Sequence, residues 1–334
     1  MTSDELRLTR LAGQHLLAPA DTQTVVRGLC GMQAQFLSHA LHGLAIRGGS
    51  GGTDGLCKSW TIRGTMHVFA EDDLPLFLHE GRTHFLRPVD TMESDEFLSA
   101  QRKQYFAELI VDSIAQGAGE RETLKAVCER AGMTERESRS VFDPWGGLLR
   151  ALSEAGRICL IVQEKKAYRL CPAFEPMAEA AAREELLRRY FTNFGPATVH
   201  DAAYFFGWTQ TRVKAAMAGL PLAELALDGE RYYRIGEGIP DAELPECLFL
   251  AGFDQLMLGY EKTRSPFLPP EHVRDIFTRA GFVRPALLVR GTVAGWWNRK
   301  GNRLTVTLFG PADRAMIVRA ARALWPELKD VEFA

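Results

Sequence analysis

Two stretches in the middle of the chain follow one plan, in which three short helices precede a pair of strands. In the first stretch, residues 123–131 have helical spacing and stop at a glycine, and residues 134–137 form a capping box that opens a second helix. An Asp-Pro pair caps a third helix over residues 143–156. Two short strands, at 157–162 and 167–170, complete this stretch.

The second stretch repeats that order. A helix through residues 186–191 breaks at a Gly-Pro pair, a second helix spans 198–206, and a third spans 209–219. A hairpin of strands 222–226 and 231–235 turns at an Asp-Gly dipeptide, which is a strong turn signal. Three helices followed by a two-stranded hairpin is the winged-helix plan, a variant of the helix-turn-helix. Two such units in tandem predict a protein built from winged-helix domains.

The two ends of the chain complete the predicted architecture. Helices at 4–17, 22–32 and 36–46 precede strands at 60–63 and 65–69, so the N-terminal segment follows the same plan. The C-terminal third combines strands with one helix, which predicts a small α+β module. The strands expected there are 247–251, 286–290, 292–297 and 304–308, and the helix is 312–324.

We therefore predict an α+β fold that is mainly α, with tandem winged-helix (helix-turn-helix) domains and a small C-terminal α+β module. The predicted segments are an N-terminal winged-helix-like domain at 1–100, winged helices at 101–175 and 176–240, and the module at 246–334.

The charge balance limits the classes of partner. The 334 residues include 40 Lys and Arg against 42 Asp and Glu, a net charge of −2, which excludes a protein that coats nucleic acid through bulk charge. The net charge is −4 over residues 1–100, −2 over 101–245 and +4 over 246–334, so a local basic face remains open in the C-terminal third. Ordinary fluctuation of surface charge explains a difference of this size equally well.

Several features indicate a cytoplasmic protein without membrane contact. No apolar run reaches the roughly 18 residues of a membrane span. Residues 1–5 lack the basic and apolar regions of a signal peptide. The six cysteines form no Cys-x-x-Cys pair, as expected of reduced thiols.

The common catalytic and cofactor motifs are absent from the sequence. The Gly-rich segment 47–55 lacks the signatures of a P-loop and of a dinucleotide site, so we interpret it as a flexible connection. His39 and His42 could share a helix face, but no carboxylate or cysteine ligand lies near them in the sequence. We therefore predict neither a metal nor a cofactor.

One candidate cluster is the pair Gln33 and Gln35, at the junction of two predicted helices. Glutamine is a poor acid, base or nucleophile, and from spacing alone a solvated helix end explains these residues best. Residues two apart do not share a face of a continuous helix, so the two amides can cooperate only if the chain bends between them.

Two further clusters carry polar side chains. Strand alternation would place Arg63, Thr65 and His67 on one side of a strand pair, which is as typical of a half-exposed hairpin as of a site. Asp254 follows an apolar strand, where an isolated aspartate is usually a turn or cap residue.

Four motifs, in this order, resemble the winged-helix DNA glycosylases of the AlkZ/YcaQ type. They are Gln-x-Gln at 33–35, Trp-x-x-Arg-Gly-Thr-x-His at 60–67, Phe-Gly-Pro-Ala-Thr at 194–198, and Phe-Asp with Gly-Tyr at 253–260. The resemblance implies removal of N7-alkylguanines, related bulky adducts or crosslinks from double-stranded DNA, with Gln33 and Gln35 as the catalytic residues. The Gln-x-Gln form points to the AlkZ-like branch, although its middle residue here, Ala34, is smaller than the large apolar residue expected.

The chemistry of this substrate is compatible with two glutamines. A guanine alkylated at N7 is cationic and is already a good leaving group, so the enzyme mainly has to place a water. In this interpretation Arg63, Thr65 and His67 are supporting residues or phosphate contacts, and Asp254 stabilises positive charge at the sugar. No lysine lies in these motifs, so we expect simple hydrolysis by a monofunctional enzyme.

DNA would be held by local basic groups. The candidates are Lys165, Lys166, Arg212, Lys214, Arg299, Lys300 and Arg303. Residues 296–300 interleave tryptophans with basic residues, as a DNA-contacting loop can. Plain solvated surface is the simpler explanation for each basic residue taken singly.

The alternative to a glycosylase is a non-catalytic winged-helix transcriptional regulator that binds DNA. A regulator would prefer one duplex sequence and commonly form a two-fold dimer, whereas a glycosylase would act as a monomer without sequence preference. A third hypothesis is the same enzyme with a narrow range of lesions.

Overall fold

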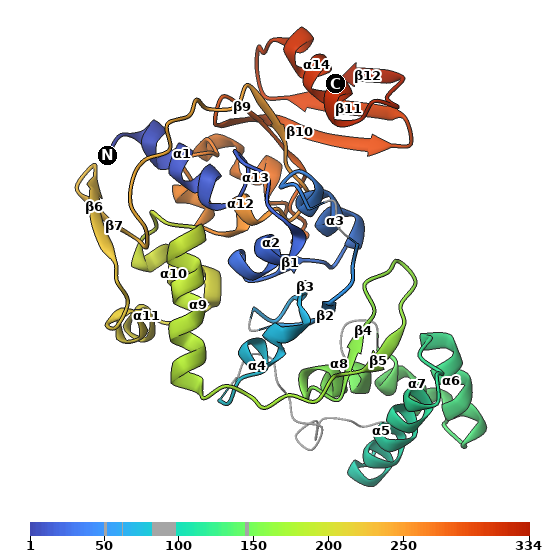
Figure 1. The fold of residues 1–334 in the computed structure, drawn as a ribbon. Coiled ribbons are helices and arrows are strands. Elements are labelled where there is room, and N and C mark those ends of the chain that lie inside the picture. Colours follow the sequence, from blue (N-terminus) through green and yellow to red (C-terminus); the bar gives the residue numbers. More distant parts are fainter. Residues whose placement is uncertain (50–51, 62, 82–97, 144–146) are drawn as a thin grey trace. The chain divides into compact units, whose positions relative to one another are not determined.

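The computed structural model is an α+β fold that separates into two compact units (Figure 1). The first unit joins Met1–Gly52 to Arg183–Ala334, and the second is Thr53–Ala182. The structure describes residues 1–49, 52–61, 63–81, 98–143 and 147–334. The division into the four segments 1–100, 101–175, 176–240 and 246–334 stays a prediction. The contacts between residues group the chain into the two units given above. Among the described residues no helix has both the length and the apolar character needed to cross a membrane.

The first unit begins with three helices and a short strand. These are α1 (Ser3–Gly13), α2 (Thr22–Gly28), β1 (Met32–Gln33) and α3 (Leu37–Ala45). The predicted helix over 22–32 ends at residue 28, earlier than expected. Cys30 and Gly31 have φ angles of 54° and 83°, and this left-handed backbone cannot continue a helix.

The second predicted three-helix stretch is confirmed element by element. It contains α9 (Glu179–Asn193), α10 (Val199–Phe206), α11 (Gln210–Met217), β6 (Ala223–Leu227) and β7 (Glu230–Arg234). Thr198 and Thr209 accept hydrogen bonds from the first turns of α10 and α11. The hairpin turns through Asp228 and Gly229, whose φ angles are 50° and 80°.

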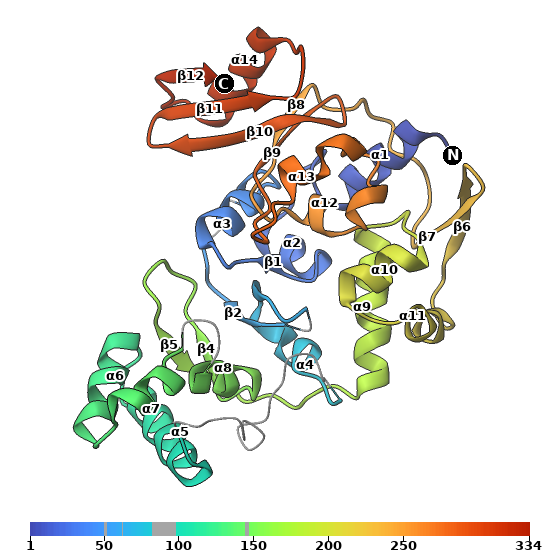
Figure 2. The ribbon, with the colours of Figure 1, turned by 180° about the vertical axis from the view of Figure 1, so that it is seen from behind.

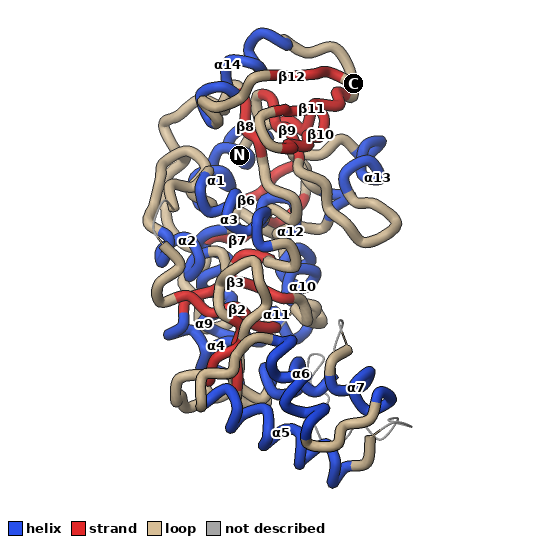
Figure 3. Tube along the Cα trace, turned by 90° about the vertical axis from the view of Figure 1, so that its right-hand side faces the viewer, coloured by secondary structure: helices blue, strands red, loops and turns tan. Residues whose placement is uncertain are grey.

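The C-terminal module is a sheet with one helix packed against it (Figures 2 and 3). Its elements are β8 (Cys247–Phe249), β9 (Ala286–Val289), β10 (Thr292–Lys300), β11 (Arg303–Leu308), α14 (Arg314–Leu324) and β12 (Asp330–Phe333). The sheet order is β12-β11-β10-β9-β8, with only the β11–β12 pair parallel. Strand β12 was not expected, because its four residues lie at the sheet edge and alternate between exposed and half-buried.

Short helices connect β8 to β9. They are α12 (Gln255–Leu258), the 3-10 turns Lys262–Arg264 and Pro270–His272, and α13 (Val273–Ile276). The side chain of Asp254 accepts a hydrogen bond from Leu256 and thereby caps α12.

The described residues of the second unit form a sheet and the helices α4 to α8. Its elements are β2 (Leu56–Trp60), β3 (Met66–Ala70), the 3-10 turn Glu71–Asp73, α4 (Leu74–Phe77), α5 (Ala100–Ala115), α6 (Arg121–Arg130), α7 (Glu135–Val141), α8 (Gly147–Glu154), β4 (Ile158–Leu160) and β5 (Tyr168–Leu170). The strands lie in the order β3-β2-β4-β5. The capping box at Thr134 and Glu137 is confirmed, whereas the Asp143-Pro144 cap lies partly outside the described residues.

Two features of this unit differ from the expectation. Helix α5 was not predicted, although Phe106, Ile110 and Ile114 follow helical spacing and enter the core. Strands β4 and β5 continue the sheet of β2 and β3, because Lys58 pairs with Leu160. A winged helix would leave them as a separate hairpin, so the tandem winged-helix assignment stays a prediction.

Candidate active site

The two glutamines meet in the first unit, where the backbone bends. Gln33 ends β1 and Gln35 lies two residues later, before α3. The Nε2 of Gln33 donates to the Oε1 of Gln35 at 2.6 Å. The two residues do not lie on a continuous helix, since β1 ends at Gln33 and α3 begins only at Leu37. Gln33 is buried and Gln35 is exposed, so the pair reaches from the interior to the surface.

This hydrogen bond determines which donor and acceptor groups of the two amides remain available. Gln33 donates through its nitrogen and keeps its own carbonyl oxygen as an acceptor. Gln35 accepts through its oxygen and keeps an exposed NH₂ as a donor. One acceptor and one donor side by side can hold a small molecule that both donates and accepts, such as water.

Buried residues pack against the Gln-x-Gln motif on the side away from solvent. The middle residue, Ala34, is fully buried. The Nε2 of Gln255, also fully buried, donates to the carbonyl of Gly31 at 2.5 Å. A Cβ on Gly43 would lie 2.7 Å from the Cε of Met32, so the end of the Met32 side chain packs directly against this glycine of α3.

An aromatic group lies directly after the glutamines. Phe36 is 50% exposed and is stacked on Phe253, with ring centroids 5.9 Å apart and 20° between the planes. Phe282 meets the Phe36 ring edge-on at 5.5 Å. Phe253 has a φ of 57°, a strained conformation for an aromatic residue of the kind that concentrates at functional sites. The only signal of this group in the sequence was the Phe-Asp motif at 253–254, which does not indicate the contacts with Phe36 and Phe282.

Asp254 has a different role from the one expected. Its two carboxylate oxygens accept from the guanidinium of Arg47 at 2.8 and 2.9 Å, and both side chains are fully buried. A carboxylate held in this way is inaccessible to a sugar, so the expectation that Asp254 stabilises charge there is wrong. Asp254 instead joins the end of α3 to the start of α12.

Arg47 was not identified from the sequence either. It was assigned to a flexible Gly-rich connection, but its Nε donates to the carbonyl of Gln14 at 2.9 Å and its Nη1 to that of Gly43 at 2.8 Å. These bonds and the pair with Asp254 satisfy the buried charge. The interpretation of residue 47 as part of a flexible segment is therefore wrong.

Arg63, Thr65 and His67 belong to the second unit. The N–H of Thr61 donates to the carbonyl of Thr65, and Gly64 has a φ of 69°, so Arg63 and Thr65 lie in a turn. Only His67 lies on a strand, and the prediction that alternation aligns the three is wrong for that reason. The Nδ1 of His67 lies 2.9 Å from the carbonyl oxygen of Thr65 and 3.0 Å from the Oγ1 of Thr61. The side chain is fully buried, which does not suit a phosphate contact.

His67 gives a prediction for stability against pH. Burial, and secondarily Arg63, lowers the pKa of His67 from 6.5 to about 3. The unfolded chain takes up the proton first as pH falls, so folding should lose about 1.4 kcal/mol per pH unit from this group. The loss should begin near 6.5 and end near 3. Urea unfolding at several pH values should show a shallower dependence for His67→Gln than for wild type. Equal slopes for His67→Gln and wild type would contradict the assignment.

The predicted DNA-contacting residues fall into two groups. Lys165 pairs with Glu120 at 2.7 Å, Arg299 pairs with Glu327, and Arg303 lies within 3.8 Å of Asp330. Arg212, Lys214, Lys166 and Lys300 are exposed, and the described part of the chain gives them no ion pair. Contact of these residues with DNA stays a prediction.

The tryptophans of segment 296–300 lie on β10 rather than in a loop. Trp297 is buried in the core of the module, and its Nε1 donates to the carbonyl of Leu250 at 2.9 Å. Trp296 is half-buried beneath the guanidinium of Arg284. The expectation that Trp297 contacts DNA is therefore wrong.

All six cysteines are free thiols. In the described ranges, no three His, Cys, Asp or Glu side chains are placed to hold a metal ion.

Comparison with known proteins agrees with the resemblance drawn from the motifs. The Streptomyces sahachiroi "Interstrand DNA cross-link repair glycosylase" is 26% identical over 322 residues, covering 87% of this chain and 85% of that protein. The solved structure of Streptomyces sahachiroi DNA glycosylase AlkZ has the same fold, with a TM-score of 0.79 at 20% identity and 100% of both chains covered. The sequence model of the family "DNA glycosylase AlkZ-like" matches residues 26–331. Because that match spans most of the chain, this protein belongs to the AlkZ-like family of DNA glycosylases.

Proposed function

We propose that this DNA glycosylase hydrolyses the N-glycosidic bond of guanine alkylated at N7, including bulky adducts and interstrand crosslinks, with Gln33 and Gln35 positioning the water. The observation that carries the proposal is the 2.6 Å hydrogen bond between the two amides. It leaves an acceptor on Gln33 and an exposed donor on Gln35. The Streptomyces sahachiroi relative is named as an interstrand crosslink repair glycosylase, which supports the inclusion of crosslinks among the substrates.

The reaction needs little acid or base help. The C1′–N9 bond breaks, and its electron pair neutralises the cationic base as that base leaves. Water forms the new bond to C1′ and loses its proton to solvent. Because the leaving group is already activated, the enzyme's contribution is to hold the water in line, and positioning of this kind can supply several kcal/mol of barrier reduction. Glutamine, which does not titrate, suits that task.

The test is release of free base from a duplex containing one N7-methylguanine, with a duplex carrying an N7 crosslink as the second substrate. We expect abasic sites from both and none from undamaged DNA. No release from either, together with sequence-preferring binding to undamaged duplex, would support the alternative of a transcriptional regulator. A monomeric state and a cytoplasmic location remain predictions.

The exposed ring of Phe36 gives a further prediction. We expect it to stack on a nucleobase at the lesion, since base–aromatic stacking contributes about 1–3 kcal/mol per base. Phe36→Ala should therefore weaken binding to the lesion duplex by about tenfold or more, and Phe36→Trp should retain it. Tyr204→Ala on α10, which removes a ring 44% exposed, is the matched control. Fluorescence anisotropy with labelled duplex measures the affinities, and unchanged binding by Phe36→Ala would contradict the stacking role.

The two unpaired residues on α11 give a prediction about salt. If Arg212 and Lys214 each neutralise one phosphate, replacing both with Gln should reduce the slope of log K against log salt by about 1.8. Lys165→Gln should have a smaller effect, because Lys165 already pairs with Glu120. Titrations at several salt concentrations check this. A slope unchanged in the double variant would remove α11 from the DNA interface.

A further inference from the structure

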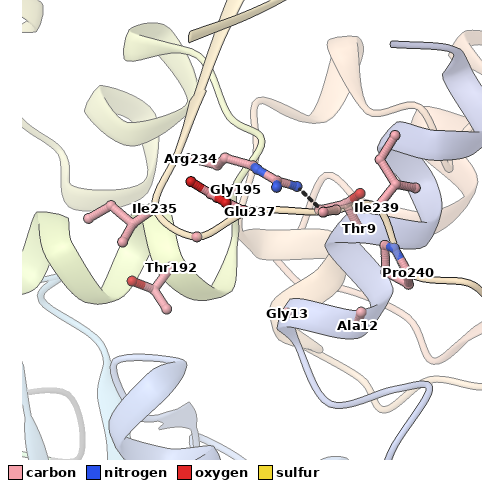
Figure 4. A pocket seen from close by; sticks show the side chains of 12 residues that line it. Thr9, Ala12, Gly13, Thr192, Gly195, Arg234, Ile235, Glu237, Ile239 and Pro240 are labelled. Carbon is pink, nitrogen blue, oxygen red and sulfur yellow. Dashed lines mark hydrogen bonds between the residues drawn. The ribbon is translucent and has the colours of Figure 1, made fainter. Parts of the chain in front are cut away.

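A hollow lies in the first unit, lined by none of the residues of the glutamine pair. It has a volume of about 270 Å³ and is lined by α1, the end of α9 and the loop that follows β7 (Figure 4). Arg234, the last residue of β7, extends across it toward residues 236–240. Nothing in the proposed excision reaction uses this pocket.

Arg234 is a buried charge with few partners. Only 8% of the residue is exposed. Its Nη1 donates to the carbonyl of Gly238 at 2.6 Å, and its buried Nε has no hydrogen-bond partner. Within the described ranges no carboxylate forms an ion pair with it. The guanidinium therefore keeps most of its donors and its whole charge uncompensated.

The other two buried arginines of this unit are compensated. Arg10 lies 3.6 Å from Asp201 and over the ring of Tyr260, and Arg47 has its two-oxygen contact with Asp254. Burying a charge without a partner is costly, so buried arginines are normally paired. Arg234 departs from this rule, and it does so beside an open pocket. An anion in the pocket would give Arg234 the counter-charge that Asp254 gives Arg47.

The loop opposite Arg234 carries backbone N–H groups, which are uncharged hydrogen-bond donors for an anion in the pocket. The described structure gives no acceptor for the backbone N–H groups of residues 236–239. Gly236 and Gly238 have φ angles of 97° and 78°, so the loop has a conformation that needs glycine at both positions. Glu237 also lines the pocket and is its one acidic residue among those described. It forms no ion pair with Arg234 and should oppose an anion.

We propose that this pocket binds an oxyanion of the phosphate class, with Arg234 as its charged ligand. Guanidinium groups bind phosphate oxygens through two parallel hydrogen bonds, and the only hydrogen bond that Arg234 makes among the described residues uses its Nη1. The anion is either a phosphate of the DNA backbone or free phosphate. The proposal does not depend on base excision.

The first test is thermal stability of the full chain as inorganic phosphate replaces chloride at constant ionic strength. Wild type should show a saturable rise in melting temperature, and Arg234→Gln should show none. Without phosphate, Arg234→Gln should be at least as stable as wild type, because it removes an uncompensated buried charge. Glu237→Gln should lower the phosphate concentration at which the rise in melting temperature saturates. Arg231→Gln, on the same strand but exposed and near Glu224, is the matched control.

The second test separates the two sources of phosphate, using undamaged duplex so that excision is not involved. If a DNA phosphate occupies the pocket, Arg234→Gln should lower the salt slope of duplex binding by about 0.9, and free phosphate should compete with the duplex. If free phosphate is the ligand, the melting shift should persist while duplex binding stays unchanged. An equal response of wild type and Arg234→Gln to phosphate, together with equal salt slopes, would overturn the proposal, as would a large loss of stability in phosphate-free Arg234→Gln.

Discussion

Replacing Gln33 and Gln35 with Ala should lower the rate of base release from N7-methylguanine duplex by at least about tenfold, which corresponds to about 1.4 kcal/mol of barrier. The two amides share one hydrogen bond, so each single variant should lose nearly as much as the double variant. Single-turnover kinetics at saturating enzyme measures the effect.

Two comparisons make this result specific. Gln101→Ala, which removes an exposed glutamine on α5, should leave the rate unchanged. The affinity of the double variant for the lesion duplex should stay close to that of wild type, because the amides act on water rather than on DNA. A double variant that excises at the wild-type rate would remove the glutamines from the mechanism.

Asp254→Ala should lower the free energy of unfolding by about 3–5 kcal/mol, because it leaves the guanidinium of Arg47 buried without its counter-charge. The same change removes the cap of α12, which adds to the loss. Urea unfolding with a probe in the first unit measures the change.

The matched control for this prediction is a surface pair. Asp4 pairs with Arg7 at 2.8 Å, but its side chain is 67% exposed. Asp4→Ala should therefore cost less than about 1 kcal/mol. Replacing both members of the buried pair, Arg47→Met with Asp254→Leu, should recover part of the stability. An Asp254→Ala variant as stable as wild type would show that the pair does not hold these segments together.

Short-range sequence signals correctly predicted the helix caps and turns that neighbouring residues determine. The capping box at Thr134 and the Asp-Gly turn at residue 228 lie within a few residues of the elements they control, and both are present. The meeting of Gln33 and Gln35 also depends on a short-range bend. Motif resemblance, rather than spacing, supplied their assignment to catalysis.

What the sequence did not reveal depends on contacts between distant residues. Arg47 and Asp254 are 207 positions apart, and nothing in either local pattern indicates that each is the other's partner. The predicted strands 60–63 and 65–69 differ from β2 and β3 because Gly64 and the Thr61–Thr65 hydrogen bond place residues 63–65 in a turn. The uncompensated charge of Arg234 has no sequence signal at all, because the pocket that it lines is formed with α1 and the end of α9, which are distant from it in the sequence.

The most direct test of a positioned water is the choice of nucleophile. Excision of N7-methylguanine in water containing a fixed fraction of methanol gives either an abasic sugar or its methyl glycoside. If Gln33 and Gln35 hold one water at C1′, wild type should form almost no methyl glycoside, while the residual reaction of the double variant should partition as spontaneous depurination does. Partitioning by wild type in the spontaneous ratio would contradict the central claim, because it would mean that the enzyme does not select its nucleophile.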